Sequence, residues 1–353
     1  MSELPQPQQP PSVNSRNLLI VLGALGVVVL VTAVTCGVVG FLFRDRIFDL
    51  GDPGTTTLTV EAVTAGGGTP DRKALERTRD VLADRIEAAE FDRRSVEIDG
   101  DRRLVLKVDG VGKEDVLRSL AGTGELRMRR VLGSVPDQST ASTPALPPDA
   151  GPVPSRAEVA TRLGGAYQIA VGITAPGAPD PATTAALAPF ASLTPAQVAA
   201  LPSAMQYAVP TVTCPQLAAR PAGATAATDQ LVACARADLP TKYLMDVAKV
   251  SAADIDTAEA SLEQSVGEWI VAINFTSTGQ QRWTDLTREA FTAGEGNNQV
   301  AIVLDDVVIS APAVLDVLTG GAHISGDFTR DSAMVLAAQL NSEPLPLVLR
   351  AVN

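Results

Sequence analysis

Histidine and cysteine are scarce in this chain of 353 residues. It has one histidine, His323, and three cysteines, Cys36, Cys214 and Cys234. Zinc sites take several such side chains, often in pairs a few residues apart. A single histidine and the lack of any Cys-x-x-Cys pair therefore argue against a metal site, and the sequence predicts no cofactor.

The sequence also lacks the arrangements from which catalytic sites are usually built. His323 has Ser310, Ser325 and Asp327 near it in the sequence, but no Gly-x-Ser-x-Gly turn brings a serine forward. The glycine run at 66–68 is not followed by the lysine of a phosphate-binding loop. The prediction is a protein that is not an enzyme, and an enzyme of the cell envelope is the last of three hypotheses.

Positive charge is in deficit. Lysine and arginine total 28 against 40 aspartates and glutamates, which gives a net charge of −12. Binding to nucleic acid or to anionic lipid requires clustered cations, so this balance argues against both. Hydrophobic residues make up 46% of the chain, enough to fill the cores of about two domains.

One long hydrophobic run is present, at residues 18–43, and it carries no charge. About 20 apolar residues cross a bilayer, so we predict a single transmembrane helix, preceded by a disordered tail at 1–17. A cleaved signal peptide would be shorter, and a lipoprotein site at Cys36 has poorly fitting residues before it. The flanking charges, Arg16 and Arg44 among them, do not decide the orientation.

Cys214 and Cys234 are the only cysteines after the apolar run. One pair at this spacing suits a disulfide in an oxidising compartment. A bond that closes such a loop contributes roughly 3 kcal/mol to stability. Two unpaired buried thiols are the alternative.

Residues 55–132 alternate between strand and helix patterns. The order is β-α-β-β-α-β, with a hairpin turn at 99–101 and a last strand at 125–132. This order is typical of a ferredoxin-like unit.

The amino-acid composition changes at 133–240, where sixteen of the 25 prolines lie among alanines and threonines. Proline interrupts helices and sheets, so we expect an insertion without long regular elements. Strands are predicted at 164–173 and 207–212, and a short helix at 194–201. The insertion is expected to be loose at first and held near its end by the disulfide.

Residues 241–353 predict a second α+β unit, with helices on one face of a mainly antiparallel sheet. Helices are expected at 279–291 and from Thr329 to about 340. Strands are expected at the following ranges: 243–250, 269–275, 299–304, 307–310, 322–325 and 345–349.

Three aromatic residues of this unit are candidates for binding a peptide. They are Trp269, Phe275 and Trp283. Indole rings line many peptide grooves, and packing in the core is the alternative.

A second set of residues is assigned to turns. Asp305 and Asp306 form a two-residue turn between strands, and an acid–base pair or a calcium site is the other interpretation. Gly320, Gly321 and Gly326 are predicted in tight turns that need positive φ, with an anion-binding nest as the alternative.

The last third of the chain carries five short sequences in a fixed order. They are Trp-Ile-Val-Ala-Ile-Asn-Phe at 269–275, Ala-Ile-Val-Leu-Asp at 301–305, Val-Ile-Ser-Ala-Pro at 308–312, Gly-Gly-Ala-His-Ile-Ser-Gly at 320–326 and Leu-Ala-Ala-Gln-Leu at 336–340. Together they resemble SecD, the membrane subunit of the bacterial protein-export machinery, over about 243–353. Arg85 with the Gly-Thr-Gly-Glu-Leu sequence at 122–126 extends the resemblance to the base of the same extracytoplasmic domain.

The resemblance implies a base at 55–132, an insertion of the actinobacterial kind at 133–240 and a head at 241–353. SecD continues into further membrane helices, whereas this sequence stops at Asn353, so we expect the first extracytoplasmic domain without the motor helices. Positions 343 and 344 are Glu-Pro, where SecD usually has Gly-Ala.

The resemblance and the cysteine pair together place the tail in the cytoplasm and the bulk of the chain outside the cell membrane. The expected function is to bind translocating polypeptide, or a component of the export channel, in a groove between base and head or by strand addition at a sheet edge. The alternative is an extracytoplasmic ligand-binding or sensor protein that reuses the fold.

Overall fold

The structure, a computed structural model, describes residues 54–352 except for 65–66, 92–93, 138–152, 174–175, 178–179, 222 and 236–239. The predicted tail at 1–17 and the predicted membrane helix at 18–43 lie outside this range. None of the helices in the described part combines the length and the apolar character needed to cross a bilayer.

A four-stranded antiparallel sheet with two helices opens the described chain; we call it the four-stranded unit. Its elements are β1 (Thr55–Val63), α2 (Arg72–Ala88), β2 (Arg94–Asp99), β3 (Arg103–Asp109), α3 (Glu114–Leu120) and β13 (Val348–Ala351). The strand order is β13-β1-β3-β2. Helix α2 starts at Asp71, whose carboxylate accepts from the N–H of Ala74, and it buries Leu75, Leu82 and Ile86.

The order of elements up to α3 is as predicted, but the assignment of the last strand of this sheet is wrong. The strand predicted at 125–132 is β4 (Leu126–Pro136), and it pairs in a different sheet. The fourth place, beside β1, is taken by β13 from the other end of the chain. Leu345 and Leu347, just before β13, are buried in the core of the four-stranded unit. The strand predicted at 345–349 is found three residues later, at 348–351, and the alternating leucines did not specify its partner.

The second sheet, here called the central sheet, is built around β4. Its remaining strands are β5 (Leu231–Cys234), β6 (Thr241–Met245), β7 (Val250–Ser251), β10 (Val300–Leu304) and β11 (Val307–Ser310). The order is β11-β10-β4-β6-β5, and a bridge between Ala235 and Val308 joins the two ends. The sheet therefore curls on itself around a small core that includes Val131, Met245 and Val303.

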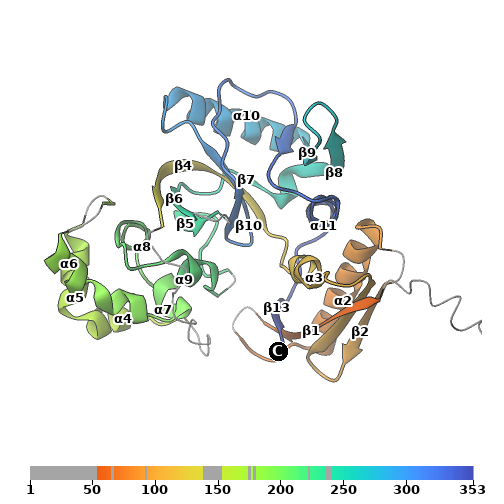
Figure 1. The fold of residues 1–353 in the computed structure, drawn as a ribbon, viewed down its shortest axis with the longest axis horizontal. Coiled ribbons are helices and arrows are strands. Elements are labelled where there is room, and N and C mark those ends of the chain that lie inside the picture. Colours follow the sequence, from red (N-terminus) through yellow and green to blue (C-terminus); the bar gives the residue numbers. More distant parts are fainter. Residues whose placement is uncertain are drawn as a thin grey trace, which may run out of the picture. The chain divides into compact units, whose positions relative to one another are not determined.

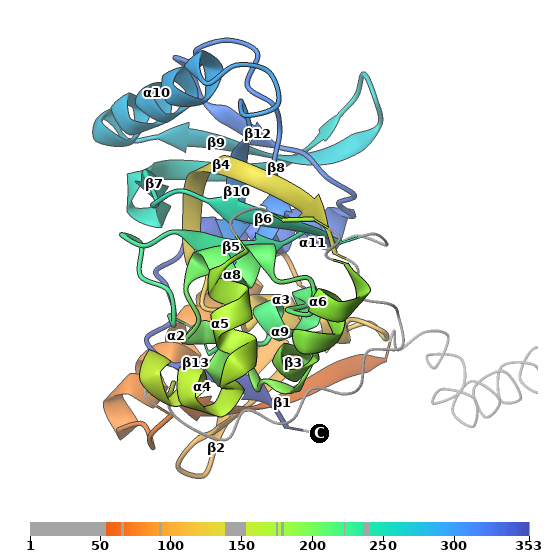
Figure 2. The same cartoon turned by 90° about the vertical axis from the view of Figure 1, so that its left-hand side faces the viewer.

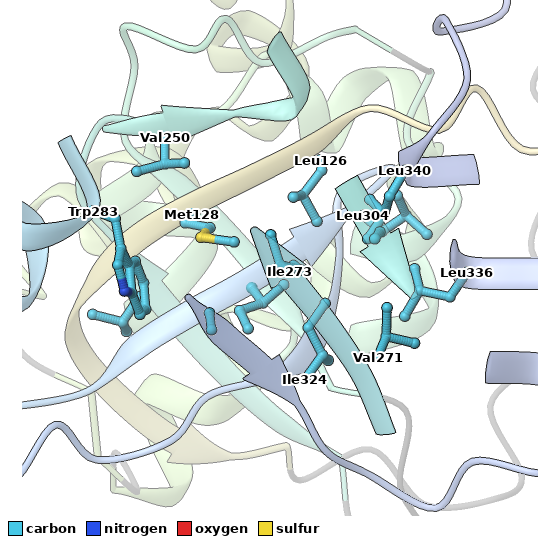
Figure 3. Packing of buried hydrophobic residues seen from close by; sticks show 14 of the residues in the cluster. Leu126, Met128, Val250, Val271, Ile273, Trp283, Leu304, Ile324, Leu336 and Leu340 are labelled. Atoms are coloured by element: carbon cyan, nitrogen blue, oxygen red, sulfur yellow. The ribbon is translucent and has the colours of Figure 1, made fainter. Parts of the chain in front are cut away.

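The third sheet, the outer sheet, has the order β12-β9-β8. Its strands are β8 (Ile255–Glu263), β9 (Glu268–Phe275) and β12 (Ala322–Ile324), and α10 (Ser277–Thr292) packs beside it. This sheet and α10 lie together at one side of the central sheet (Figure 2). One core fills the space between them (Figure 3). The strand predicted at 269–275 and the helix predicted at 279–291 are confirmed.

Helix α11 (Arg330–Leu340) lies between the outer sheet and the four-stranded unit (Figure 1). Its cap is Thr329, as predicted, with the side chain accepting from the N–H of Ser332. Leu336 and Leu340 belong to the core under the outer sheet. Val335 and Ala338 belong to the core of the four-stranded unit. One helix therefore closes two cores.

The insertion is helical and has a core of its own, formed by residues such as Val159, Phe190 and Leu217. Its helices are α4 (Arg156–Leu163), α5 (Gly165–Val171), α6 (Pro181–Ala186), α7 (Pro195–Ala199), α8 (Ser203–Ala208), α9 (Cys214–Ala218) and a 3-10 turn, Ala188–Ser192. They gather in one group beside β5 and β6 (Figure 1). The helix predicted at 194–201 is confirmed, but the strands predicted at 164–173 and 207–212 are wrong. Helix α5 occupies most of the first segment, and the second holds the end of α8 and a turn.

Candidate functional site

The chain crosses twice between the four-stranded unit and the rest of the structure: it leaves through the loop 120–125 and returns through residues 342–345. One buried side chain, Arg85 on α2, binds both of these segments. On the outgoing passage its guanidinium donates to the carbonyls of Leu120 (3.1 Å), Gly122 (2.6 Å) and Thr123 (2.9 Å). On the returning passage it donates to the Ser342 hydroxyl (2.7 Å) and the Glu343 carbonyl (3.0 Å). We call the group formed by Arg85, the loop 120–125 and residues 342–343 the junction.

The loop of the junction is fitted closely around Arg85. Gly124 has a φ of +79°, and a Cβ atom there would lie 2.5 Å from the guanidinium Nη2. Glycine is therefore required at this position both by the backbone conformation and by the close approach. The same loop accepts the N–H of Leu345 through the Thr123 carbonyl at 2.9 Å, so the two passages also bond directly to each other.

Asp305, one of the predicted turn residues, binds the junction from the central sheet. Its carboxylate accepts from the backbone N–H groups of Glu125 (2.9 Å) and Gly124 (3.2 Å) and from the Thr123 hydroxyl. Asp305 and Asp306 form the β10–β11 turn with φ values of 51° and 60°. The predicted two-residue turn is confirmed. The carboxylate of Asp305 is engaged with the loop, which does not favour an acid–base or calcium role.

Burial and a neighbouring charge act in opposite directions on the pKa of Arg85. Desolvation lowers the pKa of Arg85 to about 10, and the charge of nearby Asp305 opposes that effect. Arg85 still carries its proton at neutral pH, so its donors remain available to the carbonyls. A buried cation whose donors are satisfied by several hydrogen bonds is tolerated inside a protein, whereas removing it leaves buried carbonyls unpaired.

A cavity of about 490 Å³ adjoins the junction. The loop at 121–125, the last residue of α9 with 219–221 and Gly223 after it, the Asp305–Asp306 turn and β13 line it. Arg220 is buried at this place and donates to Gln206, to Leu217 and to Val232. Burial raises the pKa of Asp306, and the charge of Arg220 opposes this shift. The cavity is thus a partly apolar space with three acidic residues in its lining, Glu125, Asp305 and Asp306.

Two arginines of β4 attach the insertion to the central sheet. Arg127 donates to the Thr225 carbonyl at 2.8 Å, and Arg129 donates to the carbonyls of Asp229 (2.6 Å) and Asp246 (2.7 Å). The segment between α9 and β5 is therefore bound along the sheet. Since the insertion also continues directly into β5 and β6, its anchorage is to the central sheet.

The predicted disulfide is confirmed. Cys214 and Cys234 are bonded, with Cα atoms 5.8 Å apart, and join the start of α9 to the end of β5. Lys242 lies opposite Cys234 in the β5–β6 ladder. Its ammonium donates to the Val212 carbonyl at 2.6 Å, and burial lowers the pKa of Lys242 to about 8.

The three aromatic residues predicted for peptide binding all pack on one core. Trp283 is 4% exposed and stacks on Phe275, with ring centroids 5.5 Å apart. Trp269 is half-buried against the same core. Trp283 also lines a groove of about 450 Å³ between β10, β12 and the segment at 312–318. Peptide binding by these three side chains stays a prediction.

The prediction of positive φ at three glycines is wrong. Gly320, Gly321 and Gly326 all have ordinary backbone conformations. Gly321 is small for another reason, since a Cβ atom there would lie 2.5 Å from the carbonyl oxygen of Ile273 on β9. It is contact between backbones, and not a turn or an anion nest, that requires glycine at this position.

Part of this chain is similar in sequence to known proteins. The family described as the SecDF P1 head subdomain matches residues 230–347. The protein translocase subunit SecD of Streptomyces coelicolor is 39% identical over 111 residues, which are 31% of this chain and 20% of that protein. The SecD of Acetobacter pasteurianus is 33% identical over the same number of residues, with the same coverage.

This chain contains a SecD-like head subdomain. The matching region spans about a fifth of the length of those two relatives. Two solved structures are also similar: a SecDF crystal structure in a super-membrane-facing form (19% identity, TM-score 0.42, 85% of this chain and 30% of that one) and the structure of SecDF as a membrane component that enhances protein export (19%, 0.41, 84% and 98%).

Sequence reasoning missed the junction, although one signal was present. Arg85 stands among the positions Leu75, Leu82, Ile86 and Ala89, which form the apolar stripe of α2. A charged residue on a buried helical face requires partners, because burying an unpaired charge is costly. The sequence did not show that those partners are main-chain carbonyls from two distant segments.

Proposed function

We propose that this chain is a non-enzymatic, membrane-anchored protein that displays a SecD-like base and head outside the membrane and acts in protein export. The observation that carries the proposal is the match of residues 230–347 to the SecDF P1 head subdomain. The predicted helix at 18–43 would anchor it, with the tail at 1–17 in the cytoplasm. The bonded cysteines support an oxidising compartment for the rest.

The predicted base, insertion and head at 55–132, 133–240 and 241–353 form the working parts of this proposal. Two strands are exchanged relative to those boundaries, because β4 joins the central sheet and β13 completes the four-stranded sheet. Arg85 and Asp305 hold the passages between base and head, so the head is presented in a defined orientation. A head held in this way can receive an unfolded chain as it leaves the export channel.

The action we propose is transient binding of a translocating polypeptide or of an export-channel component. A photo-reactive amino acid placed at exposed positions of the head, such as Leu315 or Phe291, tests it in cells. Crosslinks to secretory proteins that are arrested during export support the proposal. The same probe at Lys73, which is exposed on α2, is the control for random encounters. Equal labelling from all three positions, or none from any of them, contradicts it.

The cavity at the junction supports a second candidate function, the binding of a small ligand by a sensor. Its volume of about 490 Å³ is of the size that holds small molecules. A saturable rise in melting temperature with one compound from a metabolite set favours this candidate. Loss of that rise in Asp306→Asn, with the fold intact, would locate the ligand in the cavity.

A further inference from the structure

The groove beside β12 has an apolar floor and one open side. Val300 and Ile302 on β10, together with Trp283 on α10, line its inner part. Leu315 and Leu318 line its rim, and they are 82% and 40% exposed. Figure 3 shows Trp283 at one end of the core cluster that also includes Ile273 and Ile324 of the outer sheet. The groove is therefore an accessible extension of the main core.

One wall of the groove is a sheet edge that pairs with no further strand among the residues the structure describes. Strand β12 is the last strand of the order β12-β9-β8, and Gly321, Ala322 and His323 line the groove. The opposite edge of this sheet is occupied, since Asn341 accepts from the N–H of Ala258 at 2.8 Å and donates to its carbonyl at 2.7 Å. The side chain of Asn341 covers part of the β8 edge, whereas β12 forms the other edge of the sheet.

The register shows which groups of β12 face outward. The backbone groups of Ala258 point away from β9, because Asn341 binds them, and Ala258 lies opposite Ile273. Backbone groups alternate in direction along a strand, so Ile273 bonds toward its partner Ala322 on β12. The N–H and C=O of His323, one residue further on, therefore point away from the sheet and toward any added strand.

A polar atom of one lining residue also lacks a partner. The indole Nε1 of Trp283 is buried and has no hydrogen-bond acceptor within the described ranges. Buried donors are almost always paired, so an orphaned donor in the lining of a groove indicates a place for an acceptor. A backbone carbonyl of a bound chain would supply one.

The charge of the groove limits which chain fits. Its lining, all within the described part of the protein, contains Asp316 and no lysine or arginine. The whole chain carries a net charge of −12. An acidic segment would be repelled, whereas an apolar segment with basic residues complements both the floor and the surrounding charge.

We propose that the groove binds an extended polypeptide segment by strand addition to β12, with an apolar side chain at every second position entering the floor. The outward groups of His323 pair with the backbone of the segment, and Leu315 covers the side chain that enters. Strand addition takes affinity from main-chain hydrogen bonds and selectivity from alternate side chains. The inference rests on the proposed function and names the binding site for the polypeptide.

The test uses the full chain and a short dye-labelled peptide that has leucine at every second position and lysine at both ends. His323→Pro removes the outward N–H, and proline is tolerated on an edge strand when its nitrogen faces away from the sheet. Binding is expected to weaken roughly tenfold, as the loss of a hydrogen bond and a poorer fit would cause. His323→Ala keeps the N–H and should bind as the wild type does.

Leu315→Ser is the second arm, and it is expected to weaken binding several-fold because the rim loses its apolar cover. Leu262→Ser, an exposed leucine on β8 outside the groove, is its matched control. If His323→Pro fails to fold, judged by its thermal melting curve, a peptide methylated on alternate backbone nitrogens replaces it as the probe on the wild-type chain. That peptide should bind weakly.

The outcomes separate this inference from the proposed function. Undiminished binding in both His323→Pro and Leu315→Ser overturns the groove as the site. So does a wild-type chain that binds a reduced, unfolded protein but not the peptide, and that result leaves the proposed function standing. A wild-type chain that binds neither overturns both.

Discussion

Within the described part of the chain, five cationic side chains are buried and bind main-chain carbonyls: Arg85, Arg127, Arg129, Arg220 and Lys242. All but Arg220 donate to carbonyls of segments distant in sequence, for example Leu120 and Glu343 around Arg85. Carbonyls in loops have no ladder or helix to satisfy them, and leaving them unpaired inside the protein is costly. The buried cations therefore stabilise the irregular connections between the sheets.

Arg85→Lys is expected to destabilise the folded chain by about 3 kcal/mol, because an ammonium cannot replace a planar guanidinium that reaches both passages of the junction. Urea unfolding, followed by circular dichroism, measures the change. Arg85→Met should cost at least as much.

Arg79→Lys is the matched control for this prediction, since Arg79 lies on the same helix and pairs with Asp80 at the surface. Its effect should stay within about 0.5 kcal/mol. Equal effects of the two lysine substitutions would show that the junction contacts contribute nothing beyond a surface ion pair.

Lys242 gives a prediction about pH. Its pKa is lowered from 10.5 to about 8 in the folded chain, chiefly by burial. Between these values the unfolded state binds more protons, so the contribution of this group to stability rises with pH. From pH 7.5 to pH 9.5 the wild type should gain on the order of 1 kcal/mol relative to Lys242→Met.

Urea unfolding of both proteins at the two pH values measures that gain. Lys73→Met, on the exposed face of α2, is the control, and its difference from the wild type should be the same at both pH values. A difference between wild type and Lys242→Met that is independent of pH would mean that the ammonium is not buried in the folded state.

At the scale of elements, the insertion was predicted to lack long regular structure, and the structure shows a group of short helices instead. Its prolines stand at the first or second position of several helices, as Pro181, Pro195 and Pro215 do in α6, α7 and α9. Proline is favoured there, because the first N–H groups of a helix need no partner within it. A count of prolines predicts broken structure, whereas their positions after Asp180, Thr194 and Thr213 predict helix starts.

Strand pairing shows where sequence reasoning ends. Local patterns correctly predicted strands at 269–275 and 307–310, helix α11 from its Thr329 cap, and the two-residue turn at Asp305. Partner choice depends on contacts between distant segments, so the exchange of β4 and β13 between sheets could not be predicted from the alternation of leucines alone. The junction around Arg85 depends on that exchange and was missed with it.

The disulfide provides a test at this scale. Replacing both Cys214 and Cys234 by serine should lower the free energy of unfolding by about 3 kcal/mol, since a loop closed in the unfolded chain is released. Both residues lie in the core of the insertion. Limited proteolysis should therefore cut the variant first within 156–218.

Cys36→Ser serves as the control for this substitution and should leave the digestion pattern unchanged. A double variant as stable as the wild type, with first cuts outside the insertion, would mean that the bond does not hold this segment.

At the scale of the whole described chain, the four-stranded unit and the sheets of the head share structural elements and are not joined by a simple linker. Strand β4 follows the four-stranded unit in sequence but pairs in the central sheet, and β13, from the end of the chain, pairs in the four-stranded sheet. Helix α11 supplies side chains to the cores on both sides. Parts that share a helix in this way lose contacts together when either one opens. The arrangement therefore favours unfolding of base and head as one cooperative unit.

Two neighbouring residues of α11 test this cooperativity. Val335 faces the core of the four-stranded unit and Leu336 faces the core under the outer sheet. Leu336→Ala should cost roughly 2 to 4 kcal/mol and Val335→Ala somewhat less, because each leaves a cavity. In calorimetry both substitutions should move the same transition to lower temperature. If Val335→Ala moved one transition and Leu336→Ala another, base and head would be independent, and the orientation that Arg85 and Asp305 give to the head would have to come from elsewhere.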